Sequence, residues 1–202
     1  MSRLTDKEAR FIAALRRRDE KAFSVLVLRF QDRVHNLVFR LLGSHEEARD
    51  VSQEVFVTVF EKIDHFRGES KLSTWIYRVA SNHAKNRIKY LSRRKDRQQD
   101  SFDDMLTPPS SGRFSAAIGR PDEDAERSQL SAFIQASLRG LDDEQRLVVV
   151  LRDIEGQSYE AIADITGLNL GTVKSRLHRG RVRLKDALDD YRTGRAVLTG
   201  GS

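Results

Sequence analysis

The 202-residue chain contains no cysteine and only three prolines, and what it lacks narrows what the protein can be. Without cysteine there can be no disulfide, no thiol nucleophile and no zinc site with thiolate ligands. No apolar run approaches the roughly 20 residues that a membrane-spanning helix needs. The first ten residues, MSRLTDKEAR, lack the apolar segment of a signal peptide, so we expect a cytoplasmic protein without membrane insertion.

Sequence motifs of catalysis are missing as well. The five histidines show no pair at i and i+4 and no HExxH pattern, and neither a Walker glycine loop nor a GxSxG turn occurs. The acidic residues lie mainly at predicted helix starts, where capping and the helix dipole explain them. We therefore predict no enzyme: no catalytic residue, no metal and no cofactor.

The composition instead indicates a soluble, helix-rich protein with a polyanionic partner. Charged residues make up 33% of the chain and the formal net charge is +6, a balance that fits nucleic acid without requiring it. All three prolines fall between Asp96 and Asp122, where the helical spacing of apolar residues is lost. We predict an all-α fold of two small helical domains, at 1–95 and 123–192, with a flexible linker at 96–122 and a frayed tail at 193–202.

Capping residues and apolar spacing define the helices of the first domain. Apolar residues at steps of three and four between positions 19 and 43 give the strongest amphipathic signal in the chain, and Gly43 is expected to end that helix. Helix starts are predicted by two capping boxes and one single cap: Thr5 with Glu8, Ser44 with Glu47, and Asp19.

The helix that starts after Ser44 has more apolar residues than one core face needs. Phe56 and Phe60 widen its apolar set, and Asp50, Gln53 and Glu54 give it an acidic, hydrogen-bonding face. One interpretation is an ordinary core helix with a solvated edge. The other is a docking surface for a protein partner with complementary basic groups. The residues alone leave both open.

A fourth helix is predicted to start near Ser73, after a loop with Gly68, and to carry a nucleic-acid surface. Between Lys85 and Arg97 there are seven cations and one acid, interleaved with asparagine and tyrosine. Amides can read base edges, and aromatic rings can stack on unpaired bases. Trp75 belongs to this set, although a single aromatic residue is more often part of a core.

The second domain contains a helix-turn-helix pattern between positions 158 and 183. Ser158 can cap a first helix that Gly167 ends, and Asn169 can cap a second helix with an apolar stripe that extends to Leu188. A cap at Asp142 and an apolar run at 148–150 indicate a further helix at the centre of a small core, a helix that continues through Leu151 and that Gly156 ends. The second helix of such a motif enters the DNA major groove. A helical hairpin with a solvated basic face is the simpler alternative.

With these motifs in place, the chain resembles the bacterial extracytoplasmic-function sigma factors, small two-domain specificity subunits of RNA polymerase. The resemblance covers residues 19–191. Four motifs carry it: AFSVLVLRF, EEARDVSQEVFVTVF, FRGESKLSTWIYRVASNHAKNRIK and LRDIEGQSYEAIADITGLNLGTVKSRLHRGRVRL.

The resemblance implies two partners, core RNA polymerase and promoter DNA, and commonly a third, an anti-sigma factor. Docking on the clamp helices of the largest polymerase subunit would use Asp50, Gln53, Glu54, Phe56 and Phe60. Recognition and opening of the minus-ten element would use Phe66, Arg67, Ser73, Trp75, Arg78, Asn82, Asn86 and Arg87. Recognition of the minus-thirty-five element as duplex would use Lys174, Ser175, His178 and Arg179, with Thr172 and Arg176 nearer phosphates.

A stand-alone helix-turn-helix regulator, whose first domain only dimerises or binds a ligand, is the alternative from another class. The acidic face around Asp50 separates the two hypotheses. A sigma factor needs that face to bind the polymerase, whereas a free regulator does not.

Overall fold

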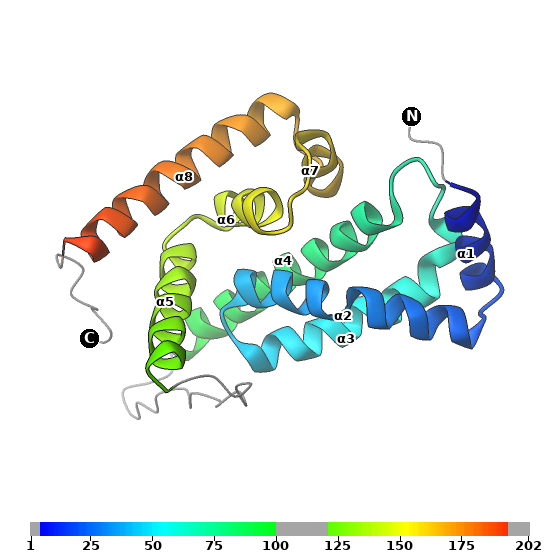
Figure 1. Ribbon diagram of the computed structural model, residues 1–202, viewed down its shortest axis with the longest axis horizontal. Coiled ribbons are helices and arrows are strands. Elements are labelled where there is room, and N and C mark those ends of the chain that lie inside the picture. The colour runs from blue at the N-terminus through cyan, green and yellow to red at the C-terminus, as the bar shows by residue number, and fades with distance from the viewer. Residues whose placement is uncertain (1–4, 100–120, 194–202) are drawn as a thin grey trace.

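Two groups of helices make up the computed structural model, which describes residues 5–99 and 121–193 (Figure 1). The N-terminal half contains α1 (Asp6–Arg16), α2 (Glu20–Leu42), α3 (His45–Lys62), a 3₁₀ turn η1 (Ile63–His65) and α4 (Leu72–Gln99). The C-terminal half contains α5 (Pro121–Arg139), α6 (Asp143–Val149), a π-helical turn η2 (Val150–Ile154), α7 (Tyr159–Thr166) and α8 (Leu170–Arg192). The described residues contain no strand, in agreement with the predicted all-α class.

The core of the N-terminal half lies between three long helices that run side by side, α2, α3 and α4 (Figure 1). Their apolar residues recur at steps of three and four, so each helix buries one stripe. Leu26, Val34, Leu37, Val51 and Ile76 are fully buried. Burial of such a side chain contributes about 1.5–3 kcal/mol, so this interface dominates the stability of the half.

The predicted helix boundaries here are largely confirmed. Thr5 and Glu8 form a complete capping box, and Gly43 ends α2 in the left-handed conformation with φ 76°. The Asp19 carboxylate accepts from the Ala22 amide at 2.7 Å, as an N-cap does. The box at Ser44 is only half formed: its hydroxyl caps α3, but the Glu47 carboxylate turns away to pair with Arg87 of α4.

The C-terminal half packs α6 and α7 against the first half of α8. Val148, Leu151, Ile162, Val173 and Leu177 are all 0–2% exposed, which confirms the small core predicted around 148–150. The predicted caps at 158, 167 and 169 also form. The apolar stripe of α8 was predicted to extend too far along the helix, because Leu188 is 39% exposed.

Two further expectations for this half were wrong. Asp142 occupies the N-cap position of α6 without capping it, and its carboxylate instead lies 3.5 Å from Arg183 of α8. The helix was also expected to continue regularly beyond Val150. It widens into the π turn η2, in which the Glu155 amide donates to the Val150 carbonyl at 3.0 Å, one residue further back than in an α-helix.

The halves share one continuous core. α7 packs along α4, and α5 and α6 lie against α2 (Figure 1). α4 continues to Gln99 and α5 starts at Pro121, so both ends of the predicted linker, 96 and 122, fall within these helices. Residues 100–120, most of that linker, and residues 194–202 of the predicted tail lie outside the described residues. Among the described helices, none is long and apolar enough to cross a membrane.

Candidate functional surfaces

The outer face of α3 presents an acidic and apolar strip. Asp50, Gln53 and Glu54 are exposed, and Phe60 is 45% exposed although its ring also packs on Phe23 at 4.6 Å. Val57 lies within the same strip and is 57% exposed. Sequence reasoning missed Val57, although it follows Gln53 by four residues and Glu54 by three, which places all three on one helix face. Val57 and Phe60 thus form an exposed apolar pair beside acidic groups on this face of α3.

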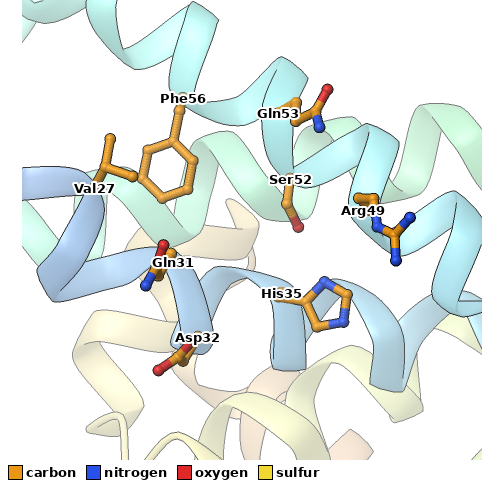
Figure 2. Close-up of a pocket in the computed structure, with 8 residues that line it drawn as sticks. All are labelled: Val27, Gln31, Asp32, His35, Arg49, Ser52, Gln53 and Phe56. Carbon is orange, nitrogen blue, oxygen red and sulfur yellow. The ribbon is translucent and has the colours of Figure 1, made fainter. Parts of the chain in front are cut away.

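Beside this strip, an open groove of about 390 Å³ runs between α2 and α3 (Figure 2). It is lined by Val27, Gln31, Asp32, His35, Arg49, Ser52, Gln53 and Phe56. In Figure 2 the ring of Phe56 extends from α3 toward Val27 of α2, while polar groups line the rest. Phe56 is half-buried and Gln53 exposed, so two of the predicted docking residues form part of the groove.

The groove also contains a histidine that favours its neutral form. Burial, and then the positive charge of Arg49, lower the pKa of His35, and only Asp32 acts in the opposite direction. The pKa of His45 at the start of α3 is lowered by burial, by His35 and by Arg49. The stacked ring of Phe39, 3.8 Å from that of His45, adds apolar surface at this end. Protonation of His35 in the groove is therefore disfavoured.

A polar network connects the α3 strip to α4. Arg87 forms ion pairs with Glu47 and with Glu54, the latter at 2.7 Å, and His83 lies 3.3 Å from the same Glu54 carboxylate. Thr58 and His83 share a 2.9 Å hydrogen bond. Burial acts to lower the pKa of Arg87, but its two carboxylate partners raise it, so the guanidinium stays charged. Arg87 therefore faces α3, away from the exposed face of α4.

That exposed face of α4 carries Arg78, Asn82 and Asn86 at successive steps of four residues. Lys89 is exposed three residues further and lies on the same strip, although sequence reasoning had counted it only as one of many cations. Within the described residues, none of these four side chains forms an ion pair. The strip combines hydrogen-bonding amides with free cations, which is the composition of a nucleic-acid contact.

The loop before α4 places its two predicted DNA residues differently. Arg67 is exposed, but Phe66 is 2% exposed, with its ring 5.6 Å from that of Trp75. Arg16 of α1 fixes the Phe66 carbonyl with a 2.6 Å hydrogen bond. Phe66 is therefore part of the core that supports the loop, whereas Trp75 and Ser73 are half-buried and retain some exposed surface.

On α8, the predicted reading residues form one exposed strip. Lys174, Ser175, His178 and Arg179 are all exposed, near the N-terminal end of the helix, and Thr172 is half-buried. Three other cations are paired with acids of the same half: Arg176 with Glu144, Arg181 with Asp153, and Arg183 with Asp142.

Close packing orients α8 so that this strip faces outward. Gly180 is buried against α6, and a Cβ placed there would lie only 2.7 Å from Cγ2 of Val149. A glycine is thus required for the helix axes to approach this closely, and the opposite face of α8 is left for a partner.

Comparisons with known proteins match the two helical halves separately. Residues 26–94 match Sigma-70 region 2, and residues 134–184 match Sigma-70, region 4. The chain is 35% identical over 180 residues to the ECF RNA polymerase sigma-E factor of Escherichia coli K12, covering 88% of this chain and 91% of the relative. It is 35% identical over 184 residues to the ECF RNA polymerase sigma factor SigW of Bacillus subtilis, covering 89% and 95%.

A solved structure shows the same fold. The sigma factor RpoE of Bartonella quintana, solved in complex with the anti-sigma factor NepR, matches with a TM-score of 0.63 and 27% identity, covering 84% of this chain and 98% of that one. Matches to both sigma-70 regions over one all-helical chain define a sigma-70-type transcription initiation factor, a non-enzymatic class of protein. Within that class, the chain belongs to the extracytoplasmic-function (ECF) sigma factors.

Proposed function

We propose that this protein binds core RNA polymerase and directs promoter-specific initiation by reading the minus-thirty-five element as duplex and opening the minus-ten element. The observation that carries the proposal is the presence of three exposed surfaces of different chemistry: the acidic and apolar strip of α3, the amide and cation strip of α4, and the basic strip of α8. The proposed activity takes place in the bacterial cytoplasm, where polymerase meets DNA.

Docking uses the α3 strip and the adjacent groove. Asp50 supplies negative charge for basic groups of the polymerase clamp helices, and Glu54, paired with Arg87 in the free protein, exchanges that partner for one of them. Phe56, Val57 and Phe60 supply apolar surface. Charged groups at the rim orient the partner, while the half-buried aromatic residues provide most of the affinity. What supports the docking interpretation is the grouping of exposed Val57 and Phe60 with exposed acids on one face of α3, beside the groove.

Opening of the minus-ten element uses the α4 strip. Asn82 and Asn86 offer donors and acceptors to the edges of unpaired bases, and Arg78 offers charge to the backbone. Trp75 retains exposed surface on which a base could stack. Phe66 and Arg87 serve this site by holding the loop and the helix in place, through the Trp75 contact and the Glu47 and Glu54 ion pairs respectively.

Reading of the minus-thirty-five element uses the N-terminal part of α8, the part that a recognition helix inserts into the major groove. Lys174, Ser175, His178 and Arg179 face the bases, and Thr172 and Arg176 lie nearer phosphates. Arg176 is paired with Glu144 in the free protein, so its phosphate contact requires exchange of one anionic partner for another.

A protein inhibitor is the third partner in the proposal. The Bartonella quintana relative was solved with an anti-sigma factor. An inhibitor that covered the α3 strip and groove would block polymerase access directly, because its contacts and those of the clamp helices would use the same side chains.

The test is reconstitution with bacterial core polymerase, comparing the wild type with Gln53→Ala plus Phe56→Ala. The matched control is Lys21→Ala plus Val25→Ala, a polar and an apolar exposed side chain on α2 that do not line the groove. We expect the groove variant to lose core binding and promoter-specific transcription and the control to keep both. Core binding that is unaffected by the groove variant would overturn the docking proposal. Specific DNA binding with no core binding at all would support a stand-alone regulator.

A further inference from the structure

The contact between the two halves is built from buried polar groups as well as apolar ones. Tyr77 of α4 is 1% exposed, and its hydroxyl donates a 2.6 Å hydrogen bond to the Glu155 carboxylate, just after η2. Gln135 of α5 is 4% exposed, and its side-chain amide donates to the carbonyls of Phe39 and Arg40 at 3.2 and 3.3 Å. Apolar surfaces alone could slide, whereas these directional hydrogen bonds between the halves form in only one relative arrangement.

Arg146 extends the same pattern. It is 9% exposed, and its Nη1 donates to the Leu41 carbonyl at 2.7 Å, while its other nitrogens donate within the C-terminal half to Leu138, Arg139 and Leu141. The last carbonyls of a helix have no partner inside it. Near the C-terminal end of α2, the Arg40 carbonyl therefore accepts from Gln135 and the Leu41 carbonyl from Arg146 of the other half, and separation of the halves would return both carbonyls to water.

The contact between the halves limits the distance between the α4 strip and the α8 strip, although both strips stay exposed. The α4 and α8 strips both remain accessible in the closed arrangement. Elements named for positions −35 and −10 are roughly 25 base pairs apart, about 85 Å along a straight duplex. A compact chain of about 200 residues has a radius of gyration of only about 17 Å, so it cannot place both strips at that separation. The 21 residues from 100 to 120 could bridge up to about 75 Å if the halves parted.

We propose that the Tyr77–Glu155 hydrogen bond and the contacts of Gln135 with α2 form an interdomain latch, which keeps the free protein closed and must open before both promoter elements are engaged. The consequence for transcription rests on the proposed function, but the latch itself is a property of the free chain. Polymerase and promoter bind the open form, so the apparent affinity is the intrinsic affinity multiplied by the fraction of molecules that are open.

The experiment measures the distance between the halves directly. The chain has no cysteine, so Asn36→Cys on α2 and Asp186→Cys on α8, both exposed, can carry two spin labels without background. Distance distributions are recorded by pulsed electron resonance for the parent, for Tyr77→Phe, and for Tyr77→Phe plus Gln135→Ala. Thr58→Val is the matched control, because it removes a side-chain hydrogen bond within the N-terminal half alone. Thermal unfolding of each variant checks that it folds, and Tyr77→Phe keeps its buried ring even if the double variant does not fold.

We expect one short, narrow distance in the parent and the control, and a growing population of longer distances in the latch variants. Each lost hydrogen bond should shift the closed-to-open ratio by about fivefold. A parent that is already broad and long, or latch variants that match the control, would overturn the proposal. Core polymerase is then added to each sample: lengthening of the parent distance supports opening on binding, and a bound complex with the short distance contradicts it. Absence of core binding would contradict the proposed function while the distances of the free chain still decide the latch.

Discussion

The two basic helices use their cations in different ways. On α4, Arg78 and Lys89 are exposed and form no ion pair with any residue that the structure describes, and only Arg87 is tied to neighbouring acids. On α8, three arginines pair with acids of the preceding α6–η2 segment: Arg176, Arg181 and Arg183. A small domain has little apolar core, so charge pairs help to hold its recognition helix in place. Counting cations along a helix therefore overestimates the charge available to DNA, and more so in the C-terminal half.

The largest effect is expected at the most buried cation of the C-terminal half. Arg146→Met should destabilise the protein by about 3–5 kcal/mol, because four carbonyls lose a charged donor in a buried place. Arg181→Met, which breaks a half-exposed pair with Asp153, should cost less than about 1 kcal/mol. Urea denaturation of both variants measures the difference. Equal losses would mean that the two cations contribute alike.

A methyl group tests how closely α8 must approach α6. Gly180→Ala should cost about 1–3 kcal/mol of unfolding free energy, since its Cβ would meet Val149 at 2.7 Å. Gly171→Ala, where the nearest atom is Asn169 Oδ1 at 3.4 Å, is the control on the same helix and should change stability by less than about 1 kcal/mol. Calorimetric unfolding decides between them, and a Gly180→Ala protein as stable as the parent would show that the helices can move apart freely.

Two nearby arginines separate reading from support on α8. Arg179→Ala should weaken binding to minus-thirty-five duplex by about 1–3 kcal/mol if the side chain reads a base, and should relax the preference at one position. Arg181→Ala should weaken DNA binding by less than about 1 kcal/mol, because its charge is already neutralised by Asp153. Titrations of holoenzyme against promoter variants give both numbers. The comparison fails if Arg181→Ala loses as much affinity as Arg179→Ala.

The corresponding pair on α4 is the exposed Lys89 and the ion-paired Arg87. We expect Lys89 to affect DNA binding and Arg87 to affect stability. Lys89→Gln should leave stability unchanged and lower the slope of log affinity against log salt by about 0.7–0.9, the value for one phosphate contact. Arg87→Gln should instead lower stability by about 1 kcal/mol, because it breaks the bridge to Glu47 and Glu54. Salt titrations and chemical denaturation are run on both proteins. If only Arg87→Gln changed the salt slope, the phosphate contact would be made by Arg87 and not by Lys89.

The smallest effect concerns pH and the groove of the N-terminal half. The pKa of His35 is lower in the folded protein than its ordinary value of 6.5, so below that pH the unfolded chain binds more protons and stability falls as the solution becomes more acidic. His35→Gln should flatten the loss of stability as the pH falls through the ordinary histidine pKa of 6.5. Gln31→Ala, in the same groove but without a titrating group, should leave the slope unchanged. An unaltered slope in His35→Gln would assign the acid sensitivity elsewhere.

Sequence reasoning recovered the features that local interactions decide. Apolar spacing and caps at Thr5, Asp19, Ser158 and Asn169 depend on residues within four positions, so helix starts and core faces could be predicted correctly. Asp142 is the instructive failure, because a capping aspartate and one that pairs with an arginine 41 positions away are indistinguishable in sequence.

The candidate site shows the same limit. Exposure of Asp50, Gln53 and Asn82 followed from helix geometry once the core face was known. Burial of Phe66 and the turn of Arg87 toward α3 did not, since both result from contacts with other helices. The contact between the halves was likewise beyond prediction, because Tyr77 and Glu155 are 78 positions apart.

The π turn η2 makes the number of residues between Val150 and Ile154 important in related chains. Geometrically, a π turn is an α-helix that carries one inserted residue. Deletion of a single residue between Val150 and Ile154 would restore a regular helix and rotate Glu155 by about 100° relative to α6. The helix-turn-helix would survive such a deletion, but the register that aims Glu155 at Tyr77 would not. In related chains, the residue count of this segment should therefore decide which ones can close on themselves, whatever amino acids they carry there.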